Sequence, residues 1–214
     1  MTVLTIDTNY DGYVEYNLGS YTKYPTDTTL WIALNGIAKY RTFIRFPLTN
    51  LPSGAIISQV RLLVNCSQAG GTNHLLDIHP YNSDGQTDPE ADSATNAYAR
   101  CVAGTPYIDD STALRTTGAK AFTLGGNVIA DVGAAKTAVN RFSLGLHEEG
   151  DNAAVALLYA FDNGSNYPQL EITYTVPVTV NKGSGLVNTM MDLIVSGKLW
   201  SIHKQPKFTP RRLI

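Results

Sequence analysis

The sequence has little charge and no long apolar run, and each shortage excludes a class of protein. Charged residues make up 16% of the 214 positions, against about a quarter in an average soluble domain. The formal net charge is only −2, so we do not expect nucleic acid as a partner. No apolar stretch approaches the roughly 20 residues of a transmembrane helix, so we expect no membrane partner either.

Cysteine is scarce, and a secretion signal is missing from the first residues. Cys66 and Cys101 lack the spacing of a metal site, and the sequence leaves open whether they are two buried thiols or one disulfide. The opening residues 1–7 have neither a basic segment nor a long apolar core, so we expect no signal peptide. A virion protein that is released by lysis would fit this expectation.

Glycine and tyrosine are plentiful, with 18 and 12 residues, and this balance suits an all-β protein with many turns. The clearest pattern runs from Arg41 to Val64 and predicts a strand, a Pro/Gly turn and a second strand. Two sets of alternating apolar residues each share one strand face: Ile44, Phe46 and Leu48, then Val60, Leu62 and Val64. Two half-buried strands of this kind are typical of a β-sandwich.

The rest of the body follows the same pattern. We predict further strands at 2–7, 28–34, 75–79, 141–147, 155–161 and around 170–174. Asn35-Gly36 between apolar runs predicts a hairpin, and helical spacing predicts one short helix at 127–139. We interpret 11–27 as polar and turn-like, and 82–117 as a long irregular loop. The predicted fold is an all-β jelly-roll sandwich.

The chain beyond Val176 differs from this body. We predict one domain over 1–176 and an appendage over 177–214 that consists of a linker, an amphipathic helix and an extended basic arm. The tail from Lys198 onward holds five of the 16 basic residues and no acidic one. The part before it therefore carries 11 basic and 18 acidic residues, a net charge of −7.

Three stretches of the body resemble the DNRLRE-type jelly-roll domains, which are related to carbohydrate-binding modules. They are Asp11-Gly-Tyr-Val14, the segment Arg41–Val64 with its Leu51-Pro-Ser-Gly-Ala55 turn, and Tyr167-Pro-Gln-Leu-Glu-Ile-Thr-Tyr174. The resemblance covers about residues 3–176. It implies a jelly-roll fold that occurs in surface proteins, and similar folds occur in bacteriophage particles.

Enzyme motifs are missing from the sequence. There is no nucleophile elbow, zinc-protease helix or phosphate-binding loop, so we predict that the protein is not an enzyme. Asp77 and His79 lie two residues apart on the strand face opposite Leu76 and Ile78. A metal or acid–base pair there competes with the alternative of two solvated polar positions, because the sequence names no third partner.

Two loops carry candidate binding residues. The segment 82–92 offers the hard oxygen ligands Asp84, Asp88 and Glu90 for a structural calcium ion, with a plain acidic loop as the alternative; no other cofactor is expected. Tyr16, Tyr21 and Tyr24 are candidates for stacking on sugar rings. Tyrosine is also a common strand residue, so this assignment stays open as well.

The C-terminal appendage gives the sharpest functional hypothesis. It cannot build a core of its own, so we expect a partner to hold it. The candidate contact residues are apolar anchors and two arginines: Met190, Trp200, Phe208, Leu213, Arg211 and Arg212. We predict a structural virion protein, a capsid decoration, cement or fibre-associated component, that joins other virion proteins or its own copies. The alternative is a glycan-binding module.

Overall fold

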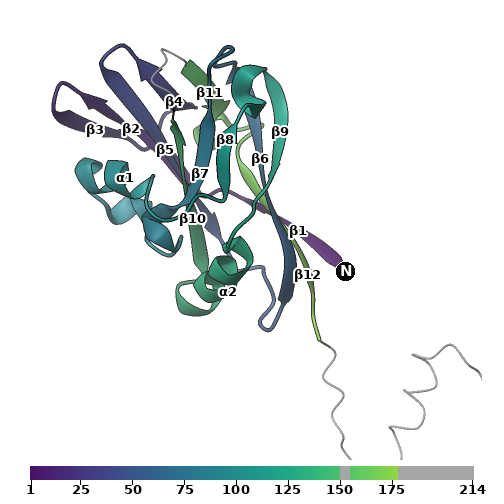
Figure 1. Cartoon of the computed structure of the whole chain (residues 1–214). Helices are drawn as coiled ribbons and strands as arrows, with labels where there is room; N and C mark the ends of the chain where they lie inside the picture. The colour runs from purple at the N-terminus through teal and green to yellow at the C-terminus, as the bar shows by residue number, and fades with distance from the viewer. Residues whose placement is uncertain (150–154, 178–214) are drawn as a thin grey trace, which may run out of the picture. The chain divides into compact units, whose positions relative to one another are not determined.

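The computed structural model describes residues 1–149 and 155–177. They form twelve β-strands and two α-helices (Figure 1). The elements are β1 (Thr2–Asp7), β2 (Tyr10–Asn17), β3 (Ser20–Tyr24), β4 (Thr29–Asn35), β5 (Ala38–Pro47), β6 (Ile56–Gln68), β7 (Leu76–Pro80), α1 (Ala94–Arg100), β8 (Ile108–Ser111), β9 (Gly118–Thr123), α2 (Val128–Ala138), β10 (Arg141–Glu148), β11 (Val155–Tyr159) and β12 (Gln169–Thr175).

The strands form one curled antiparallel sheet. Its order is β1-β12-β6-β11-β4-β5-β10-β7-β8, with the β2–β3 hairpin joined to β5 and with β9 joined to β6. Strands from both ends of this order contribute to a single buried cluster that includes Ile6, Leu62 and Ile78. The sheet therefore folds over on itself around this main core, and the predicted jelly-roll sandwich is confirmed.

The alternation seen in the sequence explains this core. Ile44, Phe46 and Leu48 are buried in the main cluster, as are the alternating apolar residues of β6. Helix α2 closes the same cluster with Val128, Val132 and Ala135, at the spacing that predicted it. The Asn35-Gly36 hairpin is confirmed too: Asn35 pairs with Ala38, and Gly36 has the positive φ of 63° that this turn requires.

The outer face of the β2–β5–β10 region carries a second, smaller core beneath helix α1. It contains Val14, Phe43, Tyr81, Ala97 and Cys101. The sequence prediction of one helix and of an irregular 82–117 loop was wrong here, since α1, β8 and two short 3-10 turns lie in that range. The side of β5 that carries Phe43 is therefore covered rather than solvated.

The interpretation of 11–27 as turn-like was also wrong. These residues form the β2–β3 hairpin, in which Tyr13 pairs with Tyr24 and Tyr16 pairs with Tyr21. Both faces of this hairpin carry tyrosine, so the segment lacks the alternation of apolar and polar residues that predicts a strand. Strand β9, which the sequence did not indicate, adds to the outside of β6.

The structure answers the question about the two cysteines, but it does not describe the C-terminal appendage. Cys66 and Cys101 are free buried thiols in separate clusters, and burial raises the pKa of both, that of Cys101 to about 12. The predicted C-terminal helix and basic arm lie outside the described residues. Among the residues that are described, no helix has the length and apolar character to cross a membrane.

Candidate functional site

The β2–β3 hairpin separates the three tyrosines that the sequence singled out. Successive side chains of a strand point to opposite faces, so Tyr16 and Tyr21 share one face and Tyr24 lies on the other. Tyr16 and Tyr21 meet Tyr98 of helix α1, with ring centroids 5.0–5.8 Å apart. The three predicted glycan contacts therefore do not form one surface.

The Tyr16–Tyr21–Tyr98 group fastens helix α1 to the sheet. The guanidinium of Arg41 lies 3.9 Å from the centre of the Tyr98 ring and donates a hydrogen bond of 2.9 Å to the Tyr98 carbonyl. This cation covers one face of the ring. Tyr98 is buried, and Tyr16 packs against the small core. This group supports the fold more than it offers a binding surface.

The opposite side of the hairpin carries a larger group, which we call the aromatic face: Tyr13, Tyr24, Trp31 and Tyr40. Tyr13 stacks on Tyr24 with a centroid distance of 4.8 Å, and Trp31 lies 5.2 Å from Tyr40. Tyr13 is buried and holds the other three together, at 6.2 Å from Trp31 and 6.0 Å from Tyr40. Tyr24, Trp31 and Tyr40 are half-buried, so part of each ring faces solvent.

Polar groups edge the aromatic face. The hydroxyls of Tyr24 and Tyr40 donate to the two carboxylate oxygens of Glu15, at 3.2 and 3.3 Å, and the Asn17 amide donates to the same carboxylate at 3.3 Å. Burial first, and then the Glu15 carboxylate, raise the pKa of both tyrosines. The rings are thus held in fixed orientations beside a carboxylate and an amide that can also bind hydroxyl groups.

The three predicted calcium ligands lie apart from this face, and two of them already contact a cation. Asp88 and Glu90 each place a carboxylate oxygen 2.8 Å from Nη1 of Arg45. Asp84 accepts the Gln86 backbone N–H at 2.9 Å. In the described part of the chain these three do not fall within one group of converging ligand atoms. The calcium site stays a prediction, and the Arg45 pairs make it less attractive electrostatically.

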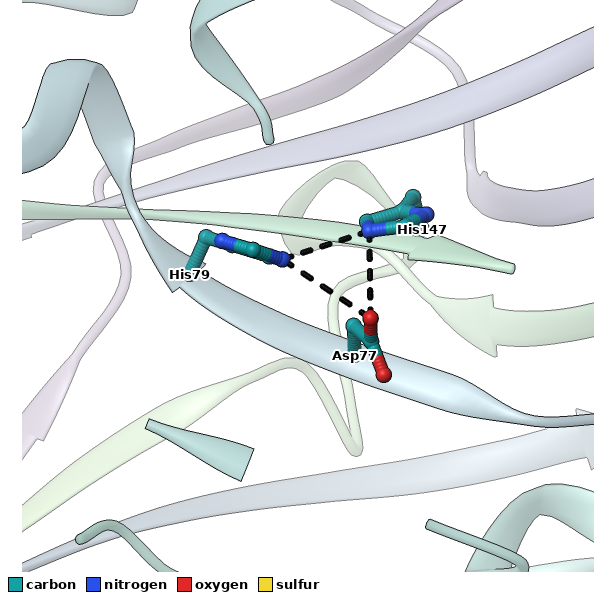
Figure 2. Close-up of side chains that lie close together, drawn as sticks. All are labelled: Asp77, His79 and His147. Carbon is teal, nitrogen blue, oxygen red and sulfur yellow. Dashed lines mark hydrogen bonds and ion pairs between the residues drawn. The ribbon is translucent and has the colours of Figure 1, made fainter. Parts of the chain in front are cut away.

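The Asp77 and His79 pair gains a third partner that the sequence did not name. His147 of β10 brings its Nε2 to 3.2 Å from His79 Nε2 and to 3.4 Å from Asp77 Oδ2 (Figure 2). Asp77 and His79 are buried and His147 is half-buried. Burial lowers the pKa of His147. The alternative of two solvated positions was wrong.

The predicted partner contacts Met190, Trp200, Phe208, Arg211, Arg212 and Leu213 lie outside the described residues. The boundary at Val176 and the anchoring role of the arm therefore stay predictions.

Comparisons with known proteins give a similarity of general shape. A solved xylan-binding module, CBM15, superposes with a TM-score of 0.40 and 8% sequence identity, over 82% of this chain and 99% of the module. A match at this level carries no functional information. No family model and no curated protein matches the chain, so the resemblance to DNRLRE-type domains also stays a prediction.

Proposed function

We propose that this protein is a non-catalytic glycan-binding module that holds a saccharide on the aromatic face. The observation that supports this proposal is the set of three half-buried rings, Tyr24, Trp31 and Tyr40, two of which, Tyr24 and Tyr40, are hydrogen-bonded to the Glu15 carboxylate. The C–H groups of a sugar ring pack on an aromatic plane, while carboxylate and amide groups bind its hydroxyls. Both components lie side by side here.

Preorganisation favours binding at this place. The rings pack against the buried Tyr13, and two of their hydroxyls are tied to Glu15. Tyr13 itself is fixed by a hydrogen bond of 3.2 Å to Asp27. Side chains that are held before the ligand arrives lose little rotamer entropy on binding. A structural virion role is still compatible with such a module, but it rests on residues outside the described ranges.

The test compares two tyrosines of one hairpin. Affinity electrophoresis against a panel of plant, algal and bacterial polysaccharides, followed by titration with the best ligand, gives the affinity of the full chain. We expect Trp31→Ala and Tyr24→Ala each to weaken binding about 2–10-fold, because a single aromatic contact contributes about 0.5–1.5 kcal/mol. Tyr21→Ala is the matched control, since Tyr21 lies on the opposite face, and it should bind as the unmodified protein does.

Two results would count against the proposal. A protein that retards on no polysaccharide of the panel is not a module of this kind. A Tyr21→Ala variant that loses binding while Trp31→Ala keeps it would place the ligand on the Tyr98 side of the hairpin instead.

A further inference from the structure

We propose that Asp77, His79 and His147 form a binding site for one divalent transition-metal ion, with Zn²⁺ as the best fit. The proposal is independent of glycan binding. It starts from strand pairing: β7 and β10 are antiparallel, Asp77 lies directly opposite His147, and His79 lies opposite Gly145. All three side chains therefore project from the face opposite the main core. Figure 2 shows them pointing toward one another.

Hydrogen bonds to the backbone fix which ring nitrogens face the centre. Nδ1 of His79 lies 3.1 Å from the Gly104 carbonyl, and Nδ1 of His147 lies 3.1 Å from the Glu148 carbonyl. A carbonyl only accepts, so each Nδ1 carries the proton, and a neutral imidazole then has its lone pair on Nε2. Both Nε2 atoms point into the group. Two imidazole lone pairs and a carboxylate oxygen consequently face one another, an arrangement that a cation at the centre stabilises.

The distances fit a small ion. The three atoms are separated by 3.2 Å between the two Nε2 atoms, and by 3.4 and 3.8 Å from Asp77 Oδ2 to His147 and His79. Ligand atoms that bind Zn²⁺ at about 2.0–2.1 Å in tetrahedral geometry stand about 3.3–3.4 Å apart. Small side-chain movements thus close the triangle on a zinc ion, and water takes the fourth position.

Outer contacts resemble those of known metal sites. Metal-binding histidines usually donate their other N–H to a carbonyl or carboxylate, as His79 and His147 do here. The second oxygen of Asp77 accepts the Asp110 backbone N–H at 2.8 Å, which orients Oδ2 toward the histidines. Every ligand is held by a partner that is not itself a ligand.

An ion can reach the site from the surface. His147 lines a pocket of about 170 Å³ together with Arg41, Tyr98 and Glu149. Glu149 is exposed, and a carboxylate oxygen of it lies within 4.8 Å of one from Asp77 and one from Asp110. The carboxyl groups of Glu149 and Asp110 therefore lie close to Asp77, where a bound cation would interact favourably with them. The pocket also leaves room for the water at the open position.

The donor set selects the class of ion. Two of three ligands are imidazole nitrogens, which suit zinc, copper, nickel and cobalt, whereas Ca²⁺ and Mg²⁺ prefer six or more oxygen atoms. A second close pair in the described structure, His74 with Glu148 at 2.9 Å, offers a contrast. Both Glu148 oxygens accept the Leu75 N–H and the pair is fully buried, so this second pair has a structural role.

The experiment is isothermal titration of the chelator-treated full chain with ZnCl₂, with CaCl₂ and MgCl₂ as controls. We expect one Zn²⁺ per chain and no heat from the other two salts. His147→Ala and Asp77→Asn should each weaken Zn²⁺ binding by more than the roughly 10–100-fold that loss of an outer contact costs. Co²⁺ should bind with the visible absorption of a tetrahedral site and lose it in both variants.

His203→Ala is the matched histidine control, since His203 is outside the described residues and outside the proposed site. It should bind Zn²⁺ as the unmodified protein does. Circular dichroism of each metal-free variant reports whether it folds. If His147→Ala does not fold, Asp77→Asn still tests the site, because its side-chain amide oxygen can accept the Asp110 backbone N–H as the carboxylate does. Absence of Zn²⁺ binding by the full chain overturns the proposal. Binding that His203→Ala abolishes overturns it too.

Discussion

Asp11 is an acid in a place that disfavours its charge. It is 2% exposed; one carboxylate oxygen accepts the Phe161 N–H at 2.9 Å and the other has no partner. Burial, opposed by that hydrogen bond and assisted by Asp162, raises the pKa of Asp11 from 3.8 to about 7. The folded protein therefore holds a proton that the unfolded chain releases near pH 4.

The sign of the pH dependence follows from this difference. Because the folded state binds more protons between pH 4 and 7, stability is fully present below pH 4 and declines as the pH rises toward 7. At about 1.4 kcal/mol per pKa unit, the loss from Asp11 is on the order of 4 kcal/mol. Asp11→Asn should remove this decline in urea titrations at pH 4.5 and 7.5. The exposed Asp109→Asn should retain it; an unchanged slope in Asp11→Asn would contradict the assignment.

For the proposed metal ligands, the sequence predicts the strand face of each residue but not which residues meet. Alternation in 75–79 and in 141–147 already placed Asp77, His79 and His147 on the faces opposite the apolar residues. What the sequence could not supply was the neighbour of each strand. Strands β7 and β10 are separated by more than 60 positions and pair only because the sheet order brings them together. The direction of the His79 lone pair also depends on the Gly104 carbonyl, which binds the other ring nitrogen, and no local sequence pattern indicates this contact.

At the scale of elements, Gly145 decides how α1 lies on the sheet. A Cβ added there would meet the backbone of Cys101, directly after the helix. We expect Gly145→Ala to destabilise the protein by about 1–3 kcal/mol or more, because backbone yields less readily than a side chain. Gly133→Ala is the matched control: its Cβ meets nothing within 4 Å in helix α2, so the helix should gain up to about 1 kcal/mol. Thermal unfolding of both variants measures the contrast, and equal effects would refute it.

Elements with a strong period were predictable, and those stabilised by distant partners were not. Strands β5 and β6 alternate over long runs, and α2 repeats apolar residues every three to four positions. Helix α1, by contrast, is a seven-residue segment that places only Ala97 and Tyr98 in a core. Its start is set by the Ser93 side chain, which accepts the Asn96 N–H at 3.3 Å. Tertiary contacts with Phe43 and Tyr81, rather than propensity, hold such a helix.

At the scale of the whole molecule, every buried hydrophobic residue of the described structure lies between Ile6 and Tyr174. The two clusters, the aromatic face and the proposed metal ligands all fall within the same span. Strand β12 closes the sheet by pairing with both β1 and β6, so the sandwich is complete once Thr175 is reached. These residues lie within 1–176, over which the sequence predicts one domain, and the boundary at Val176 stays a prediction.

A chain that ends at Pro177 should therefore fold by itself. We expect its midpoint of thermal unfolding to match that of the full chain, and its Zn²⁺ and polysaccharide affinities to be unchanged, because the residues that carry them are retained. Differential scanning calorimetry and the Zn²⁺ and polysaccharide titrations provide the comparison. Size-exclusion chromatography with light scattering reports whether self-association is lost with residues 178–214.

Two outcomes would contradict this expectation in different ways. If both chains are monomeric and the truncated chain unfolds at a clearly lower temperature at the same protein concentration, the last 37 residues contribute to the stability of the sandwich. A drop that accompanies dissociation of an assembly would instead support the predicted anchoring role of the arm.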